Sequence, residues 1–371
     1  MLSVFIFLYV SMDAHLILSD GSIYSGTSFW YDWPTDGEVV FTTGMVWYPE
    51  TLTDPSFVWQ IVCLTYPIQW NYGVPRVDEV DDRWLKKWFE SDTIHVKAVL
   101  VNTYSPGYNH CDAEMSLGEY LQVHKIPWIT WIDTRALTKK LREEWSMLGK
   151  IVVWDLPKHI DTNDVQDPNN HHLVHRVSCN EVVSYWNWEK RICVVDLGIK
   201  NNIIRSLLQC NTTLIRVPHD YPFMDGSIEF DWLFLSNGPG DPTKNTTAIQ
   251  HLDIALNKKI PIFGICLGNQ LLALAAWAKT YKLRYGHRGK NQPCKDIHTG
   301  SCVITSQNHG YAVDNETLPE NIQPWFININ DGTNEWMQFI DTPVRSVQFH
   351  PESAPWPNDS VYLFQEFVDS L

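Results

Sequence analysis

Residues 260–276 constrain the fold more than any other part of the chain. They read IPIFGICLGNQLLALAA, so an apolar run passes through two glycines into a second apolar stretch. The run IPIFGI predicts a buried strand, and LGNQLLALAA predicts a helix that begins directly after it. Such a tight strand-to-helix turn needs small residues on both sides, which Gly264 and Gly268 supply. A strand that leads directly into a helix is typical of a parallel sheet with crossover helices.

The rest of the C-terminal half has the same alternation of strand and helix. Buried-strand runs are expected at 191–197, 212–218 and 231–236, and helices at 201–209 and 247–258. At this spacing we predict an α/β fold with a mostly parallel sheet and flanking helices.

The N-terminal half has a different pattern. Residues 13–150 contain short strand-like runs between turn residues, such as HLILSDGSIYSG and EVVFTTG, and two helices at 116–124 and 134–144. This pattern predicts a β-rich α+β domain with much antiparallel sheet. Residues 151–190, rich in Asn, Asp, His and Pro, form the expected connection to a second domain at 191–371.

Composition and charge exclude several classes of function. The net charge of −15 disfavours a nucleic-acid partner, because an acidic protein repels phosphate backbones. No window is long and apolar enough for a membrane span, so no membrane partner is expected. The first ten residues lack the features of a signal peptide, and Met12 is our preferred start. The eight cysteines include no CxxC pair, which favours a reducing, cytoplasmic location.

Cys266 is the first candidate for chemistry. It occupies the centre of Gly-Ile-Cys-Leu-Gly, the thiol version of the G-x-S-x-G nucleophile elbow. At a helix N-terminus the helix dipole favours the thiolate over the thiol. The backbone amide of Leu267 would point to the same place and stabilise an oxyanion. A buried structural cysteine remains the alternative interpretation of the pentapeptide taken alone.

His350 and Glu352 supply the partners that a thiolate nucleophile requires. They end the strand-like run Ser346-Val347-Gln348-Phe349, and residues at i and i+2 of an extended segment point to the same side. Glu352 can therefore hold the His350 ring while the ring faces Cys266.

The loop at residues 236–242 is the third motif. It reads SNGPGDP directly after a strand, at the carboxyl edge of the sheet where ligands bind in such folds. It lacks the G-K-[ST] sequence of a phosphate loop. The free amides of Gly238 or Gly240 would supply a second oxyanion donor; an ordinary tight turn is the alternative.

Two further groups carry less weight. His171, His172 and His175 cluster in the connection without a Cys or carboxylate frame, so we predict no metal site. The run Lys139-Lys140-x-Arg142 is expected to be a solvated helix face beside two glutamates.

In this order the three motifs resemble those of the class I, triad-type glutamine amidotransferases. The remaining motifs are similar to those of the glutaminase subunit of carbamoyl-phosphate synthetase, from about residue 14 to the C-terminus. These motifs are GEVVFTTGM, ETLTDPSF, LTYP, IDTRALTKKLRE, MLGKI, DLGIKNNIIRSLL, FLSNGPGDP, IFGICLGNQLLALA, YGHRGKNQP, ITSQNHGYAVD and VQFHPES. The resemblance implies a flavodoxin-like amidotransferase domain after a small-subunit domain.

The resemblance also implies roles for individual residues. Cys266 would attack the glutamine amide, His350 would act as base and then acid, and Glu352 would orient His350. Amides of Gly238 and Leu267 would form the oxyanion hole. The positions that match glutamine-binding positions of the family are Ser56, Gly240, Gln270, Asn308, Gly310 and Tyr311.

The resemblance implies a two-subunit reaction. This chain would hydrolyse L-glutamine and pass ammonia to a separate large synthetase subunit that uses bicarbonate, ATP and Mg. No cofactor is expected in this chain itself. Two alternatives stay open: another thiol hydrolase on the same sheet, and a non-catalytic scaffold or regulatory subunit of a synthetase. The oligomeric state, the effectors and the choice between arginine and pyrimidine synthesis do not follow from the sequence.

Tryptophan is the one residue type that departs from the family pattern. The chain has 18 Trp and 19 Gly, so Gly makes up about 5% of it against a usual ~7%. Tryptophan stands where the family pattern leads us to expect glycine at Trp47, Trp70, Trp128, Trp131, Trp145, Trp232, Trp277 and Trp336. A second set of such positions is Trp30, Trp59, Trp84, Trp188 and Trp356. Because UGA is read as tryptophan in some genetic codes and as glycine in others, we hypothesise that many of these are glycine codons.

Overall fold

The computed structural model describes residues 11–29, 34–45, 48–66, 72–105, 107–154, 164–186, 188–340, 342–353 and 357–369. The chain forms two compact units. The first contains residues 1–48, 59–77 and 96–168, and the second contains 49–58, 78–95 and 169–371. The second unit therefore includes two segments from the N-terminal part of the sequence.

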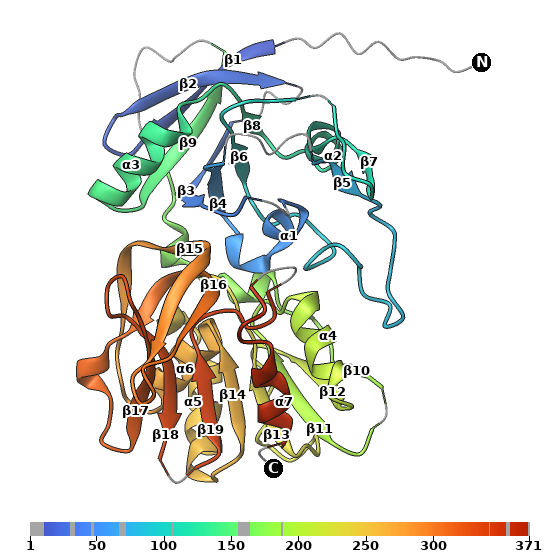
Figure 1. Ribbon diagram of the computed structural model, residues 1–371, viewed down its shortest axis with the longest axis vertical. Helices are drawn as coiled ribbons and strands as arrows, with labels where there is room; N and C mark the ends of the chain where they lie inside the picture. The colour runs from blue at the N-terminus through green and yellow to red at the C-terminus, as the bar shows by residue number, and fades with distance from the viewer. Residues whose placement is uncertain are drawn as a thin grey trace. The chain divides into compact units, whose positions relative to one another are not determined.

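The first unit is built on a seven-stranded mixed sheet (Figure 1). Its strand order is β2 (Ile23–Phe29), β1 (Ser11–Leu18), β9 (Met147–Val153), β3 (Thr35–Thr42), β4 (Gln60–Leu64), β6 (Ala98–Leu100) and β8 (Trp128–Ile129). The pairs among β2, β1, β9 and β3 are antiparallel, as expected, whereas those from β3 through β8 are parallel. A separate pair joins β5 (Val74–Pro75) and β7 (Ala113–Met115).

Two helices of this unit begin at side-chain caps. Helix α2 (Leu117–Val123) begins at Ser116, whose side chain forms a reciprocal capping box with Glu119. Helix α3 (Thr134–Glu144) begins at Asp133, which accepts a hydrogen bond from the Ala136 amide at 2.8 Å. Its bounds are those expected from the sequence.

The second unit contains a ten-stranded mixed sheet. Its strand order is β10 (Val183–Tyr185), β12 (Thr213–Pro218), β11 (Arg191–Asp196), β13 (Trp232–Leu235), β14 (Ile262–Ile265), β19 (Val344–Val347), β18 (Asn334–Phe339), β17 (Ile322–Asn328), β15 (Thr280–Asp296) and β16 (Cys302–Val313). The five strands from β12 to β19 are parallel and form the expected α/β core. The antiparallel extension from β18 to β16 was not predicted.

Helices cover both faces of the parallel strands (Figure 1). Along β11, Cys193 and Val195 pack in the same core as α5 (Thr246–Asn257) and α6 (Leu267–Ala275). The alternate residues Ile192 and Val194 pack with α4 (Asn201–Gln209) and α7 (Tyr362–Asp369). A strand buried on both faces can be apolar at successive positions, which explains the apolar run 192–195 within β11. The remaining helical segments are α1 (Tyr48–Thr53) and the short 3₁₀ turns η1 (Pro55–Phe57), η2 (Pro168–Asn170), η3 (Val174–Arg176), η4 (Pro242–Lys244) and η5 (Asn315–Thr317).

Tryptophan is over-represented among the positive-φ positions. In the described part of the chain, seven tryptophans have φ between 59° and 87°: Trp59, Trp84, Trp131, Trp145, Trp154, Trp186 and Trp277. A bulky residue there is strained, whereas glycine is not. Trp145 combines φ 87° with ψ 163°, a region essentially reserved for glycine. Trp277 follows the end of α6 and is 85% exposed, so packing does not compensate the strain.

The backbone supports the glycine hypothesis at some positions and not at others. Trp154 and Trp186 have positive φ although the sequence did not single them out. Trp128, Trp232 and Trp336 lie buried on strands, where no positive φ calls for glycine. Trp30, Trp47, Trp70 and Trp356 lie outside the described residues.

Two further features are the hydrophobicity of the helices and the state of the cysteines. None of the helices in the described ranges has the length and hydrophobicity that crossing a lipid bilayer requires. All eight cysteines lie in the described ranges, and each is a free thiol.

Candidate active site

Cys266 lies at the turn between β14 and α6, and its side chain is buried. Its backbone has φ 55° and ψ −103°, a strained conformation outside the regions usual for non-glycine residues. The Cys266 amide donates to the Val347 carbonyl of β19 at 2.8 Å, which holds the turn against the next strand. A Cβ on Gly264 would lie 2.8 Å from the Gly268 backbone, and one on Gly268 would lie 2.5 Å from the Leu235 carbonyl oxygen. Both glycines are therefore required by close packing around the thiol.

His350 and Glu352 follow β19 and form a buried pair. His350 Nδ1 lies 2.7 Å from Glu352 Oε1, and both side chains are almost completely shielded from solvent. Glu352 fixes the ring through Nδ1, and Nε2 has no hydrogen-bond partner among the described residues. The Cys266 thiol donates to the Asn308 carbonyl at 3.7 Å. Nε2 is thus the ring nitrogen available to exchange a proton with Cys266 or a ligand.

Lys200 completes the charged group beside the pair. Its Nζ donates to Glu352 Oε1 at 2.9 Å and lies 3.2 Å from His350 Nδ1 and 3.7 Å from Asp54 Oδ2. The Asn202 amide donates to the buried carboxylate of Glu90 at 3.1 Å. The sequence did not single out Lys200, Asp54 or Glu90. Lys200 follows β11 at the carboxyl edge of the parallel strands, and that position was the available signal.

These charges shift the pKa values of the site in opposite directions. Burial raises the pKa of Glu352, but Lys200 and His350 outweigh burial and lower it to about 2. Burial and Lys200 lower the pKa of His350, whereas Glu352 and Cys266 raise it, with a resulting value of about 10. Burial lowers the pKa of Lys200, but Glu352, Asp54 and Glu90 raise it above its ordinary value. Near neutral pH the site therefore holds a carboxylate, an imidazolium and an ammonium.

The backbone amides of Leu267 and Gly238 are the two expected oxyanion donors. Leu267 is the first residue of α6, and Gly238 lies in the loop after β13. Neither amide has a hydrogen-bond acceptor among the described residues. A Cβ on Gly238 would lie 2.8 Å from Leu267 Cδ2 and 2.1 Å from the Leu197 carbonyl oxygen. Only glycine lets this loop approach the helix N-terminus, where an anion is favoured.

Most of the other candidate residues gather around this turn. Asn237 Nδ2 donates to Ser56 Oγ at 3.0 Å, so the Ser56 side chain contacts the loop that contains Gly238. Gln270 Nε2, from the first turn of α6, donates to the Tyr311 carbonyl at 2.9 Å. The Tyr311 hydroxyl donates to Asn169 Oδ1 at 3.1 Å.

The remaining candidates are Asn308, Gly310 and Gly240. Asn308 Nδ2 donates to Asp54 Oδ2 at 3.1 Å, which links β16 to the charged group. Gly310 lies two residues further along the same strand. Gly240 has φ 84°, which its place in the loop requires.

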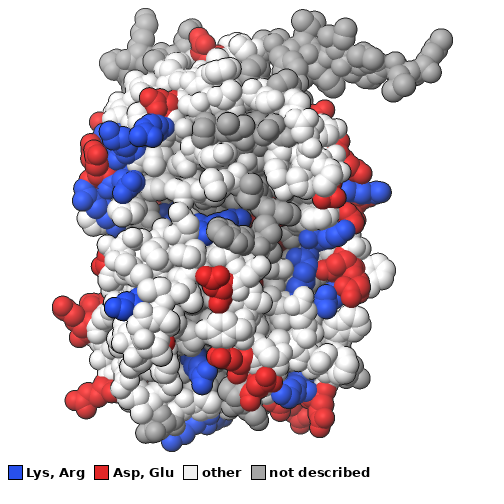
Figure 2. Space-filling view, in the orientation of Figure 1, with Lys and Arg blue, Asp and Glu red and all other residues white. Residues whose placement is uncertain are grey.

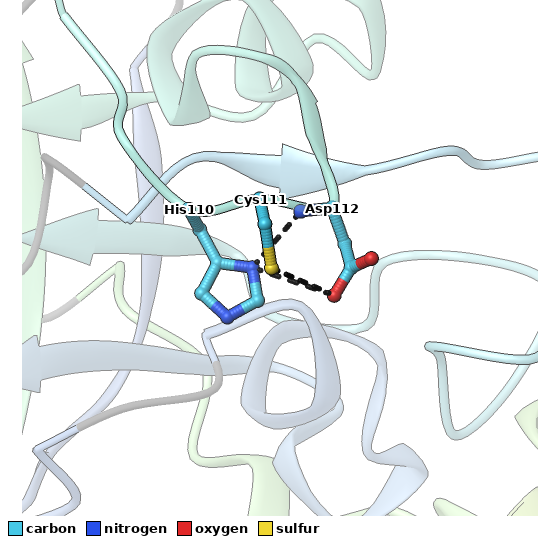
Figure 3. A group of neighbouring side chains, drawn as sticks. All are labelled: His110, Cys111 and Asp112. Carbon is cyan, nitrogen blue, oxygen red and sulfur yellow. Dashed lines mark hydrogen bonds and ion pairs between the residues drawn. The ribbon is translucent and has the colours of Figure 1, made fainter.

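Two other groups could be considered as metal ligands. His110, Cys111 and Asp112 are consecutive residues of the first unit that contact one another (Figure 3), and the His110 ring also stacks on Tyr72 at 4.1 Å. The Asp112 amide lies 3.3 Å from His110 Nδ1, so that nitrogen already has a donor. His172 Nε2 lies 3.0 Å from Asn245 Oδ1, and in the described part of the chain His171, His172 and His175 form no three-ligand group.

The basic residues of α3 are not one uniform solvated face. Lys140 pairs with Asp20 at 2.6 Å and with Glu144 at 2.8 Å. Arg135, Lys139 and Arg142 line a pocket of about 480 Å³ in the first unit. Figure 2 shows blue side chains gathered over the position of α3. The expectation of a solvated face was therefore incomplete.

Two families of known proteins match this chain. Residues 193–370 match the family described as Glutamine amidotransferase class-I. Residues 193–370 therefore form a class I glutamine amidotransferase domain, and Cys266, His350 and Glu352 lie within this range. Residues 16–151 match Carbamoyl-phosphate synthase small chain, CPSase domain.

Curated relatives match nearly the whole chain. It is 44% identical to the carbamoyl phosphate synthase arginine-specific small chain of Neosartorya fischeri, over 96% of this chain and 80% of that one. It is 46% identical to the multifunctional protein CAD of Squalus acanthias and 44% identical to the multifunctional protein pyr-3 of Neurospora crassa. Each match covers 96% of this chain, but only 16% and 21% of those proteins. The chain belongs to the carbamoyl-phosphate synthase small-chain family.

Proposed function

We propose that Cys266, His350 and Glu352 hydrolyse the side-chain amide of L-glutamine. The Cys266 thiolate attacks the amide carbon, and the imidazolium of His350 protonates the departing nitrogen to release ammonia. Water then attacks the thioester, with His350 as base, and glutamate leaves. Glu352 keeps the His350 ring oriented throughout. The observation that carries this proposal is that a strained, buried Cys266, bonded through its amide to Val347 of β19, interacts with His350 of the His350–Glu352 pair.

The two unpaired amides suit the intermediates of this reaction. Each attack gives a tetrahedral intermediate with a negative oxygen, and N–H groups aimed at that oxygen stabilise it. The amides of Gly238 and Leu267 fill this role in our proposal. Ser56, Gly240, Gln270, Asn308, Gly310 and Tyr311 would bind the rest of the glutamine molecule.

The ammonia would be used by a partner. We propose that a large synthetase chain receives it and forms carbamoyl phosphate from bicarbonate with ATP and Mg, none of which this chain would bind itself. The names of the relatives support this division of labour, since they are small chains or multifunctional proteins. The same relatives support a role in arginine or pyrimidine synthesis. The eight free thiols support a reducing cytoplasmic location.

The proposal is tested by measuring glutamate and ammonia from purified chain and L-glutamine, with and without the large chain of the same organism. We expect slow hydrolysis by the chain alone and faster hydrolysis coupled to carbamoyl phosphate in the complex. Stimulation of the large chain by free ammonia but never by glutamine would instead indicate a non-catalytic scaffold. Hydrolysis of other amides or esters in preference to glutamine would indicate a different thiol hydrolase.

The Glu352→Gln variant tests how the His350 ring is controlled. Glu352 raises the pKa of His350, so its removal lowers that pKa from about 10. Because His350 must be protonated to expel ammonia, activity is lost as pH rises through its pKa, and in the variant this loss occurs at lower pH. We also expect kcat to fall by about 10²- to 10⁴-fold, as in other triads that lose the third member.

The measurement is the pH profile of kcat, with Glu366→Gln as the control. Glu366 is exposed on α7, away from the pair. An alkaline limb at the same pH in the wild type and in Glu352→Gln would contradict this account of Glu352.

A further inference from the structure

A second buried charged group lies behind the strand that carries Asn308 and Gly310. His287 of β15 is its centre, with Nε2 at 2.8 Å from Asp331 Oδ2 and Nδ1 at 3.6 Å from Glu335 Oε1. Glu335 lies on β18 and Asp331 in the turn before it. The side chains of His287 and Glu335 are 6% and 0% exposed. Both ring nitrogens therefore face a carboxylate: Glu335 is shielded from solvent on the Nδ1 side, whereas Asp331 on the Nε2 side is 35% exposed.

The two carboxylates favour a cation at the centre of this group, against the effect of burial, which raises the pKa of Glu335. A neutral His287 could donate from only one nitrogen, and its other lone pair would face a carboxylate. Asp331 and Glu335 together outweigh the effect of burial and raise the pKa of His287 to about 9. Glu335 also accepts a hydrogen bond from Asn328 Nδ2 at 3.2 Å, which fixes its position. The result is an imidazolium held between two carboxylates.

His287 is paired directly with the strand that borders the thiol. In the β15–β16 ladder His287 lies opposite His309, and the two rings meet edge to face at 4.9 Å. The pairing of β15 with β16 changes register before His287 and again after Gly289. Hydrogen bonds between the two strands alone therefore define the position of this short stretch weakly. His309 stands between Asn308, whose carbonyl accepts from Cys266, and Gly310. A displacement of His287 would therefore shift His309, and with it the positions of Asn308 and Gly310.

We propose that His287, clamped by Asp331 and Glu335, is a positioning residue that holds the Asn308–Gly310 stretch in the geometry that binds glutamine. This inference rests on the proposed function of the site. It assigns His287 no contact with the substrate, because the imidazolium acts through His309 and the β16 backbone.

A divalent cation is the competing occupant of this group. One ligand atom each of His287, His309 and Glu335 lies within 4.8 Å of the others. The Nδ1 atom of His309 lies 2.7 Å from the Tyr311 carbonyl oxygen, and burial together with His287 lowers the pKa of His309 well below its usual value. A neutral imidazole is also what a metal would need. A proton on His287 already balances the charge of one carboxylate, so we propose the protonated state over a bound cation. The experiment below distinguishes the two.

The test is glutamine hydrolysis by His287→Gln in the full chain with its large-chain partner. We expect KM for glutamine to rise roughly 10- to 100-fold, because small misplacements of a binding segment cost about this much, with a smaller change in kcat. The double variant His287→Gln/Glu335→Gln should have a KM between those of the single variant and the wild type, since it removes the uncompensated buried carboxylate. His298→Gln, at an exposed histidine at the end of the same strand pair, is the matched control and should leave KM unchanged.

Three results would overturn the inference. An unchanged KM in His287→Gln, with a lower melting temperature, would make the group merely structural. A KM in the double variant as high as in His287→Gln would show that the charges of the group do not cause the rise in KM. If the purified wild type contained one equivalent of zinc, and a chelator raised the KM, the group would hold a metal ion and not a protonated His287. Absence of glutamine hydrolysis in the wild type would refute the proposed function itself and is thereby distinguishable from these results.

Discussion

The Cys266→Ala variant is expected to lose glutamine hydrolysis by about 10⁴- to 10⁶-fold, the range found when a covalent nucleophile is removed. No other described thiol can replace Cys266, because none lies at a strand-to-helix turn beside the His350–Glu352 pair. Folding should be preserved, since alanine keeps the Cβ and the turn depends on Gly264 and Gly268. Under the proposed function, ammonia-dependent synthesis by the complex should survive, because the partner would carry out that reaction.

The measurement is glutamate release together with mass spectrometry after treatment with an electrophilic glutamine analogue. In the wild type the adduct should map to Cys266, and in Cys266→Ala it should be absent. Cys302→Ser is the control, since Cys302 is an exposed thiol on β16 and should be dispensable. Residual glutamine hydrolysis above about 1% of the wild-type rate in Cys266→Ala would refute the covalent mechanism.

Replacing the seven positive-φ tryptophans by glycine is expected to stabilise the chain by a total on the order of 5 kcal/mol. Each strained site costs about 1–3 kcal/mol, of which the greater flexibility of glycine in the unfolded chain offsets about 0.5–1 kcal/mol. Trp145→Gly should give the largest single gain, because its backbone lies in the region open only to glycine. Trp84 and Trp277, 86% and 85% exposed, lose little packing on replacement.

Thermal unfolding of each single variant and of the combined variant provides the measurement. Trp88→Gly is the control, because Trp88 lacks a positive φ and its Nε1 donates to Glu79 Oε2 at 2.9 Å. This control should be destabilised. The coding sequence gives an independent check: UGA at Trp131, Trp145 and Trp277 with UGG at Trp88 supports glycine recoding, whereas UGG at all four positions excludes it.

The parallel core was predictable because its strands are buried on both faces and its helices are amphipathic. Helices α3 and α4 begin and end where the sequence indicated. The extension from β15 to β18 was not predictable in the same way. Strand β15 contains TYKLRYGHRGKNQPCKD, whose charges, glycines and proline obscure any alternation, and its ladder contains two register shifts. Tertiary pairing, not local preference, makes this segment a strand.

Some residues of the site were predictable from the sequence, and others were not. Cys266, His350 and Glu352 stand in local motifs whose spacing already indicates chemistry, and the structure brings them together. Lys200 and Asp54 stand in no such motif. They meet because η1 and the loop after β11 converge on Glu352, and only the folded chain shows that their charges neutralise one another. A buried lysine is rare enough that sequence reasoning places it at the surface by default.

The discontinuity of the second unit has a consequence for how this protein can be divided. Residues 49–58 and 78–95 belong to the same compact unit as 169–371, and they supply Asp54, Ser56 and Glu90 to the charged group and its loop. A fragment that starts at the first strand of the amidotransferase sheet would retain Cys266 but leave Lys200 without two of its acidic neighbours. During synthesis the ribosome releases these segments long before the strands that they join. The charged group around Lys200 is thus complete only after residues far apart in the sequence have come together, late in the synthesis of the chain.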